Sequence, residues 1–184
     1  DLVVVEGKAE TPLYLWIEDN HVEIRDASDL WGKDTYLTED EALKRVDKKG
    51  AGALVIGPAG ENLVRYAGVV VDTYRHLGRL GLGAVFGSKK LKAMVISGTE
   101  HAEISNHKRY REVYNRLYST VVQTDVMEKY HDIGTSVNIN VLNWLKGLPT
   151  KNFQSSSFPE AENISGEMFA DKYLLRRMSC AGCP

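Results

Sequence analysis

A stretch rich in glycine and in basic residues, Asp72–Lys92, contains the residue types that could bind an anion. Its glycines and cations are Gly78, Gly81, Gly83 and Gly87, and Arg75, Arg79, Lys89, Lys90 and Lys92. Glycine lets backbone N–H groups come close to a ligand, and arginine can donate two parallel hydrogen bonds to a phosphate. One interpretation is a loop that binds a phosphorylated ligand. The alternative, equally open on local chemistry alone, is a glycine-rich turn with solvated lysines.

Two common nucleotide-binding patterns do not fit this stretch. Gly83 is followed by Gly87 instead of by a glycine three residues on, so the dinucleotide-binding spacing G-x-G-x-x-G fails. The residues from Gly87 to Lys90 also lack the order of a Walker A loop, G-x-x-x-x-G-K-[ST]. A dinucleotide-binding fold is therefore a poor hypothesis.

Both cysteines, Cys180 and Cys183, form a C-x-x-C pair within the last five residues of the chain. Two thiolates at this spacing suit one metal or cluster site, but zinc or an iron–sulfur cluster normally needs four ligands. A thioredoxin-type pair would open a helix after an early strand, whereas this pair follows a predicted helix. We interpret it as half of a metal-cluster motif, with a redox dithiol or two incidental thiols as alternatives. Such thiols favour a reducing compartment.

Glu61, His21 and His131 are the other residues that could act as acids or bases. The pattern around them places Glu61 in a turn, His21 on the surface of a hairpin and His131 at a helix end. These structural roles are favoured over catalytic ones. No catalytic residue is therefore assigned in this chain.

Length and composition describe an ordinary soluble protein. The chain has 184 residues, of which 43% are hydrophobic and 26% charged, and its formal net charge is −2. That is enough chain to bury a core in one domain or one and a half. A bulk nucleic-acid binder would be more basic. No apolar run approaches the roughly 20 residues that span a bilayer, and no secretory signal is visible. We expect a cytoplasmic protein whose two ends are cut.

Strands dominate the pattern up to about residue 100. The expected strands are Asp1–Glu6, Leu13–Ile17, His21–Arg25, Ala53–Ile56, Tyr66–Val71 and Ala93–Ser97. Thr38–Glu41 matches a capping box that opens a helix ended by Gly50. Gly57–Gly60 is expected to be a turn.

Helical spacing takes over in the second part of the chain. A helix capped by Asn106 is expected through about Val122, and another over 126–131. A third is capped by Thr135 or Ser136, and a last one begins at Ser165. The sequence thus predicts an α+β protein, with a β-rich first domain over 1–103 and the start of a helical domain over 104–184.

Several strings, in order along the whole chain, closely resemble the tungsten-containing aldehyde ferredoxin oxidoreductase family. They are Val5–Glu10, Val22–Ser28, Trp31–Lys33, Ile56–Val64, Gly83–Lys89, Leu148–Phe153 and Cys180–Pro184. The resemblance implies a β-rich domain that forms a base under a bis-pterin metal centre, followed by helical domains that cover it.

The resemblance also implies an activity and its cofactors. Members oxidise an aldehyde to a carboxylic acid at a tungstopterin or molybdopterin centre and pass electrons through a 4Fe–4S cluster to ferredoxin or a similar acceptor. This segment alone is expected to be inactive. The alternative is a non-catalytic anion-binding or scaffold module derived from that domain. Substrate, metal, electron acceptor and homo-oligomer formation stay open, and neither a nucleic-acid partner nor a membrane span is expected.

Site residues follow from the resemblance position by position. Arg75, His76, Leu77 and Gly78 match the segment that contacts one pterin and its phosphate. Small residues are common in the family where His76 and Leu77 stand, so their contacts would come mainly from the backbone. Arg79 and the glycines from Gly81 to Gly87 would support the loop. Cys180 and Cys183 match the first two ligands of the cluster motif C-x-x-C-x-x-x-C.

Overall fold

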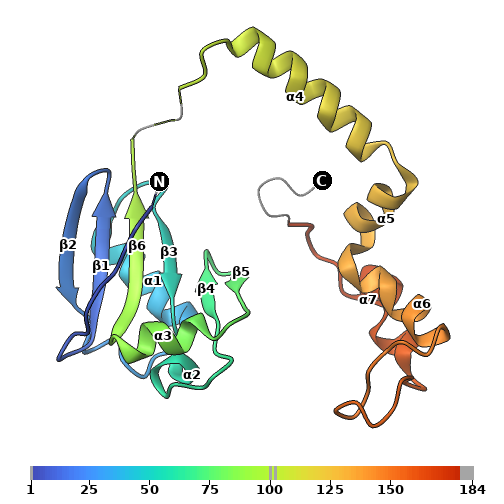
Figure 1. Cartoon of the computed structure of the whole chain (residues 1–184), viewed down its shortest axis with the longest axis horizontal. Helices are drawn as coiled ribbons and strands as arrows, with labels where there is room; N and C mark the ends of the chain where they lie inside the picture. The colour runs from blue at the N-terminus through green and yellow to red at the C-terminus, as the bar shows by residue number, and fades with distance from the viewer. Residues whose placement is uncertain (1, 100, 102, 179–184) are drawn as a thin grey trace. The chain divides into compact units, whose positions relative to one another are not determined.

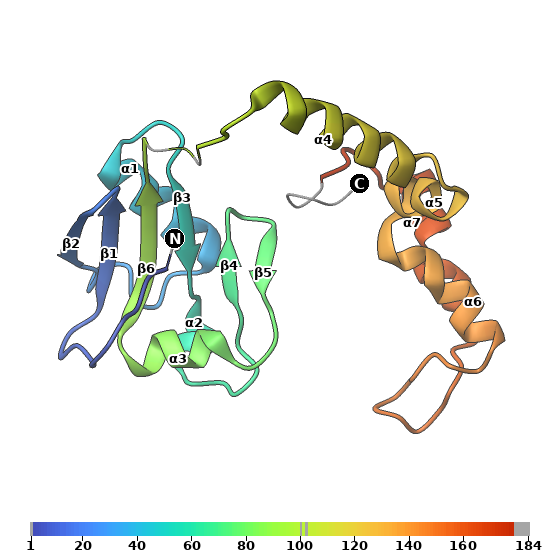
Figure 2. The same cartoon turned by 45° about the horizontal axis from the view of Figure 1, so that its top comes forward.

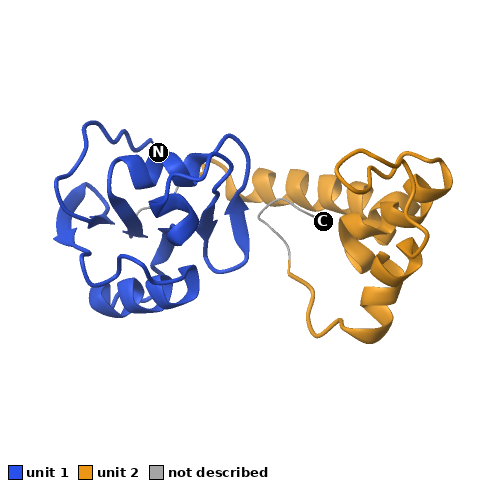
Figure 3. Cartoon of the chain, turned by 90° about the horizontal axis from the view of Figure 1, so that it is seen from below, with its two compact units in different colours: residues 1–102 blue, residues 103–184 orange. Residues whose placement is uncertain are grey.

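The computed structural model describes residues 2–99, 101 and 103–178. It contains two compact units, residues 1–102 and 103–184 (Figure 3). Within the described residues, the first unit holds a six-stranded sheet with three helices, and the second is built from helices. The predicted α+β class is confirmed.

The sheet of the first unit is mixed, with the strand order β2-β1-β6-β3-β4-β5 (Figure 1). The strands are β1 Leu13–Glu18, β2 His21–Asp26, β3 Gly52–Val55, β4 Val69–Val71, β5 Arg75–Leu77 and β6 Leu91–Ser97. Among their pairings, β1 with β6 is parallel and the others are antiparallel. This arrangement differs from the doubly wound parallel sheet of dinucleotide-binding folds.

Alternation along the strands divides the core between the two faces of the sheet. On β1, Tyr14 and Trp16 belong to the cluster that packs against helix α1, Thr35–Val46. Leu15 and Ile17 belong to the opposite cluster, which Phe86 of helix α3, Leu82–Ser88, helps to cover. Figure 2 shows α1 on one face of the sheet and α3 near one end of it.

Helix α1 begins one turn earlier than the sequence predicts. Its N-cap is Asp34, whose carboxylate accepts a hydrogen bond from Leu37 N at 2.8 Å. Thr38 is buried inside the helix and its hydroxyl donates to the Asp34 carbonyl at 2.6 Å. The predicted capping box at Thr38 is therefore wrong, because Asp34 already caps the helix by accepting from the N–H of Leu37 in its first turn. The helix also ends earlier than Gly50, with Asp47 at its C-cap.

The Asp34 cap leads to the first prediction. We expect Asp34→Ala to lower the free energy of unfolding by about 1 kcal/mol, because a first-turn N–H group loses its acceptor. Asp34→Asn should keep most of that stability, since asparagine is an equally good cap. Urea unfolding followed by circular dichroism measures both. An equal loss in the two variants would show that Asp34 acts through its charge and not as a cap.

Two further segments of the first unit differ from the predicted elements. Residues 2–6 do not form the expected strand. Val5 instead packs against the second core cluster, so its apolar character comes from packing and not from strand pairing. The segment expected to be a turn at Gly57–Gly60 contains the short helix α2, Pro58–Glu61, with proline in its first turn, where the missing N–H costs nothing. The predicted hairpin of β1 and β2 is confirmed.

The helices of the second unit mostly begin where local capping residues predict. They are α4 His107–Val122, α5 Asp125–Ile133, η1 Gly134–Val137, α6 Asn138–Trp144, η2 Ala161–Ile164 and α7 Gly166–Lys172. Asn106 and Ser165 cap α4 and α7 as expected. Neither Thr135 nor Ser136 caps a helix, because both lie inside the 3₁₀ turn η1. None of the helices in the described part of the chain is long and apolar enough to cross a membrane.

Candidate functional site

The predicted pterin-contact residues lie together at one edge of the sheet. Arg75, His76 and Leu77 form β5, and Gly78 follows directly. β5 is the last strand of the sheet: it pairs with β4 on one side, and no strand of the described sheet pairs with its other side. Arg75 is half-buried, whereas His76 and Leu77 are exposed. A strand edge of this kind presents backbone groups that a ligand could reach.

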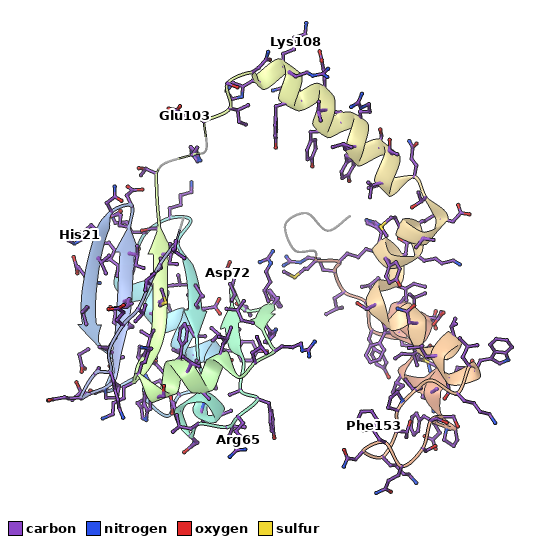
Figure 4. The ribbon with its side chains drawn as sticks, viewed as in Figure 1. His21, Arg65, Asp72, Glu103, Lys108 and Phe153 are labelled. Carbon is purple, nitrogen blue, oxygen red and sulfur yellow. The ribbon has the colours of Figure 1, made fainter. Side chains whose placement is uncertain are left out.

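A strained turn holds β5 against β4. Asp72 and Thr73 in this turn have φ angles of 44° and 63°, in the left-handed region that non-glycine residues seldom adopt. Asp72 accepts a hydrogen bond from Ala53 N at 3.0 Å through Oδ1, and its Oδ2 lies 3.9 Å from Arg75 Nη1. Figure 4 shows Asp72 at this turn, at the far end of the hairpin from Arg65.

The turn is also bound from α1. The carboxylate of Glu39 accepts hydrogen bonds from Thr73 N at 2.9 Å and from Thr73 Oγ1 at 2.6 Å. Glu39 is only 7% exposed. The turn that leads into Arg75 is therefore anchored from two sides, by the helix and by strand β3.

Most glycines of the predicted anion loop face protein backbone. A Cβ on Gly83 would lie 2.9 Å from the Ala67 carbonyl carbon, and one on Gly87 would lie 2.7 Å from the carbonyl carbon of Gly60. Gly83 and Gly87 lie in α3, so they allow this helix to approach α2 and the segment before β4. Gly78 differs, because no described heavy atom lies within 4 Å of the Cβ it would carry. Of the loop glycines, Gly78 is the one with open space beside it.

The lysines of the stretch bind groups of the protein itself. Lys89 Nζ donates to the Gly7 carbonyl at 2.8 Å, and Lys90 Nζ donates to the carbonyl of Glu10. These contacts attach the N-terminal segment to the sheet. Of the cations in the proposed anion-binding loop, these two lysines are thus used within the protein, whereas Arg75 lies on β5 and Arg79 after it is exposed.

Lys92 and Glu61 form a buried ion pair under the same region. The Lys92 side chain is fully buried and that of Glu61 is 5% exposed. Lys92 Nζ also donates to the Lys33 carbonyl at 2.8 Å, and Glu61 accepts from Gly32 N at 2.9 and 3.0 Å. Burial lowers the pKa of Lys92, and the bond to Glu61 opposes that shift. Because solvent does not reach this pair, its role is structural. Glu61 is a buried anchor at the end of α2 instead of a residue in a turn.

Several large apolar side chains near β4 and β5 are exposed. Tyr66 is 83% exposed, Tyr74 63% and Leu80 92%. Leu77, on β5 itself, is 41% exposed. Together with the guanidinium of Arg75, they give this part of the first unit both apolar surface and a positive charge. Such a surface suits a ligand or protein segment that has an anionic group beside a planar or apolar body.

The other predicted site residues do not form a second site in the described chain. His21 is exposed on β2, 3.1 Å from Glu23, and His131 lies in the last turn of α5, 3.0 Å from Asp132. Their expected positions, on a hairpin surface and at a helix end, are confirmed. Cys180 and Cys183 lie outside the described residues. Among the residues the structure describes, no group of three or more His, Cys, Asp or Glu side chains could hold a metal ion.

Glu39 was not predicted from the sequence, although its position carries a signal. Glu39 occupies the first position of an i, i+3, i+4, i+7 series that continues with Ala42, Leu43 and Val46, the apolar face of α1. A carboxylate on the apolar face of a helix needs a buried partner. That position could have identified Glu39, but not Thr73 as its partner.

The chain is similar to known protein families and to individual proteins. The family described as aldehyde ferredoxin oxidoreductase, N-terminal domain, matches residues 1–98, and the family described as domains 2 and 3 of the same enzyme matches residues 112–184. Tungsten-containing aldehyde ferredoxin oxidoreductases of Pyrococcus furiosus and Thermococcus kodakarensis are 44% and 43% identical over 188 residues. These matches cover 100% of this chain and 31% of each relative, so the chain spans about a third of their length.

Two further relatives are less similar to this chain. A WOR-like subunit of an aliphatic sulfonate oxidoreductase from Pyrococcus furiosus is 31% identical over 204 residues. Among solved structures, the active-site complex BamBC of benzoyl-coenzyme A reductase with 1,5-dienoyl-CoA gives a TM-score of 0.71 at 27% identity. That match covers 97% of this chain and 29% of the other.

Proposed function

Because the chain belongs to the aldehyde ferredoxin oxidoreductase family, we propose that it is part of an oxidoreductase that oxidises aldehydes to carboxylic acids. The main support is the 42–44% identity, along the whole chain, to enzymes named for tungsten and for this activity. The parent protein would act in the cytoplasm and pass its electrons to ferredoxin or a similar acceptor. The sulfonate and benzoyl-CoA relatives are less similar to this chain than the aldehyde enzymes are, so we favour an aldehyde as the substrate.

We assign the first unit to the base under a tungstopterin or molybdopterin cofactor. Arg75 would hold the cofactor phosphate through its guanidinium, with His76, Leu77 and Gly78 contributing backbone along the edge of the sheet. The residues present fit such a group: Arg75 is charged and half-exposed, and the space beside Gly78 is open. When bound, the metal centre supplies the two-electron oxidation in which water provides the second oxygen of the acid. The residues of this chain contribute binding and orientation.

We assign Cys180 and Cys183 as two ligands of a 4Fe–4S cluster. Their C-x-x-C spacing suits adjacent corners of one cluster, and thiolates are its usual ligands. Such a cluster needs two more ligands, which this chain does not supply because it has only two cysteines. The remaining ligands would come from the rest of the parent protein, so this segment alone would be inactive.

Arg75→Ala in the full-length parent tests this assignment. We expect it to weaken pterin binding by roughly 10- to 150-fold, because a charged hydrogen bond to phosphate contributes about 1.5–3 kcal/mol. Arg75→Lys should recover only part of the loss, since lysine keeps the charge but not the planar fork of donors. Tungsten, molybdenum and pterin content of the purified variants measure the effect. Iron content should stay unchanged, because the cluster cysteines are untouched.

Arg65→Ala is the matched control, since Arg65 is an exposed cation of the same unit at the other end of the hairpin. It should leave metal and pterin content at the level of the unmodified protein. If Arg75→Ala also retains full tungsten or molybdenum and full activity, Arg75 is an ordinary surface cation. An intact parent without tungsten, molybdenum and iron would instead favour the non-catalytic scaffold module.

A further inference from the structure

We propose that Glu39 is a positioning residue for the cofactor: its carboxylate fixes the Asp72–Thr73 turn and thereby sets the position of Arg75 at the sheet edge. This inference rests on the proposed function of Arg75. Glu39 lies on helix α1. Its hydrogen bonds among the described residues go to Thr73 and not to the predicted pterin-contact residues 75–78.

The turn needs an external anchor because its backbone is strained. Asp72 and Thr73 both have positive φ angles, 44° and 63°. For a β-branched residue such as threonine this conformation is a genuine outlier. Strain of this kind persists only where surrounding contacts enforce it, and it concentrates at functional sites.

Glu39 is built to supply that anchor. Both hydrogen bonds of its carboxylate among the described residues go to Thr73, one to the backbone N–H at 2.9 Å and one to the hydroxyl at 2.6 Å. A residue that is 7% exposed at this place on α1 would pack more easily as an apolar side chain. Because the hydrogen bonds of this buried carboxylate go to a single turn, we infer that the conformation of the turn is important for the position of Arg75.

The turn and Arg75 are close along the chain. Arg75 is two residues beyond Thr73 and pairs with Val71 at the start of β5. Asp72 also lies 3.9 Å from Arg75 Nη1 through Oδ2, while its Oδ1 accepts from Ala53 N at 3.0 Å. Releasing Thr73 would free the turn on one side and let Asp72 and Arg75 shift together. Supporting residues of this type are known to affect binding strongly at sites they do not touch.

The test is a double-mutant cycle in the full-length parent, measured as the rate at which purified protein loses its pterin on dialysis. Glu39→Gln keeps the shape of the side chain, removes its charge and replaces one acceptor oxygen with a donor. We expect it to increase the release rate about 10-fold. In an Arg75→Ala background, the same change should add less than about twofold, because Glu39 acts through Arg75. Asp40→Asn, on the exposed side of α1, is the control and should leave the rate unchanged.

A second variant addresses the strain itself. Thr73→Gly adopts a positive φ without strain, so Glu39→Gln should have little effect on pterin release in that background. The inference is overturned if Glu39→Gln leaves release unchanged, or accelerates it equally with and without Arg75. A purely structural role would lower the melting temperature and change release equally in both backgrounds. If Arg75→Ala alone does not accelerate release, the proposed contact of Arg75 fails, and this is distinguishable from a failure confined to Glu39.

Discussion

Replacing Lys92 by methionine is expected to lower the free energy of unfolding of the first unit by about 3–5 kcal/mol. The substitution keeps most of the volume of the side chain but leaves Glu61 as a buried charge without its cation. It also removes the donor to the Lys33 carbonyl. Taking away one partner of a buried ion pair is far more costly than losing a surface pair, because the remaining charge stays desolvated.

Urea unfolding followed by tryptophan fluorescence measures this loss, in a variant that also carries Trp144→Phe. Trp16 and Trp31 then remain as the tryptophans of the chain, and both belong to the first unit. Lys44→Met is the control, because Lys44 is exposed and pairs with Asp40 on the helix surface. Replacing both partners, Lys92→Met with Glu61→Leu, should cost less than Lys92→Met alone. If Lys92→Met costs no more than Lys44→Met, the pair is not a stabilising anchor.

Gly87→Ala is expected to destabilise the first unit by about 3 kcal/mol or to prevent its folding. In an open helix, alanine in place of glycine would stabilise by about 1 kcal/mol. Here the new Cβ would lie 2.7 Å from the Gly60 carbonyl carbon and 3.3 Å from the Glu61 Cα. These are backbone atoms that cannot rotate away, so α2 and α3 would have to separate. Overpacking usually costs about 1–3 kcal/mol, and a backbone clash lies at the upper end of that range.

Gly78→Ala is the matched control for this clash, because the Cβ there would meet no described atom within 4 Å. Its unfolding midpoint should stay close to that of the unmodified chain, and the same fluorescence assay measures both variants. A stable Gly87→Ala protein would mean that the close approach of α2 and α3 is not required. A large loss in Gly78→Ala would show that this segment is sensitive to any added side chain.

Local signals in the sequence were sufficient for much of the fold. Alternation and a turn located the β1–β2 hairpin, and single polar residues located the starts of α4 and α7. The helix α3 was missed because its glycines resemble those of a loop. These glycines are needed because α3 lies close to α2. The sequence does not show this contact, because Gly60 lies far from Gly87 along the chain.

The candidate site was only partly predictable for the same reason. Arg75 and Gly78 could be selected from residue type and family resemblance. Lys92 was counted among the cations of the loop, as an anion contact or a solvated lysine, because its partner Glu61 is 31 residues away. The bond from Thr73 to Glu39 spans 34 residues. Contacts of this range depend on the sheet topology, which a single sequence does not reveal.

The place of β6 in the sheet has a consequence for the order of folding. β6 lies between β1 and β3, and Leu13 is in register with Leu91. The β1–β2 hairpin can therefore form early, but the other edge of β1 stays unpaired until β6, Leu91–Ser97, has been synthesised. Pairing of strands this far apart closes a large loop before it gains contacts, which slows folding. During synthesis the early hairpin thus has an unpaired edge, the type of surface that chaperones protect from aggregation.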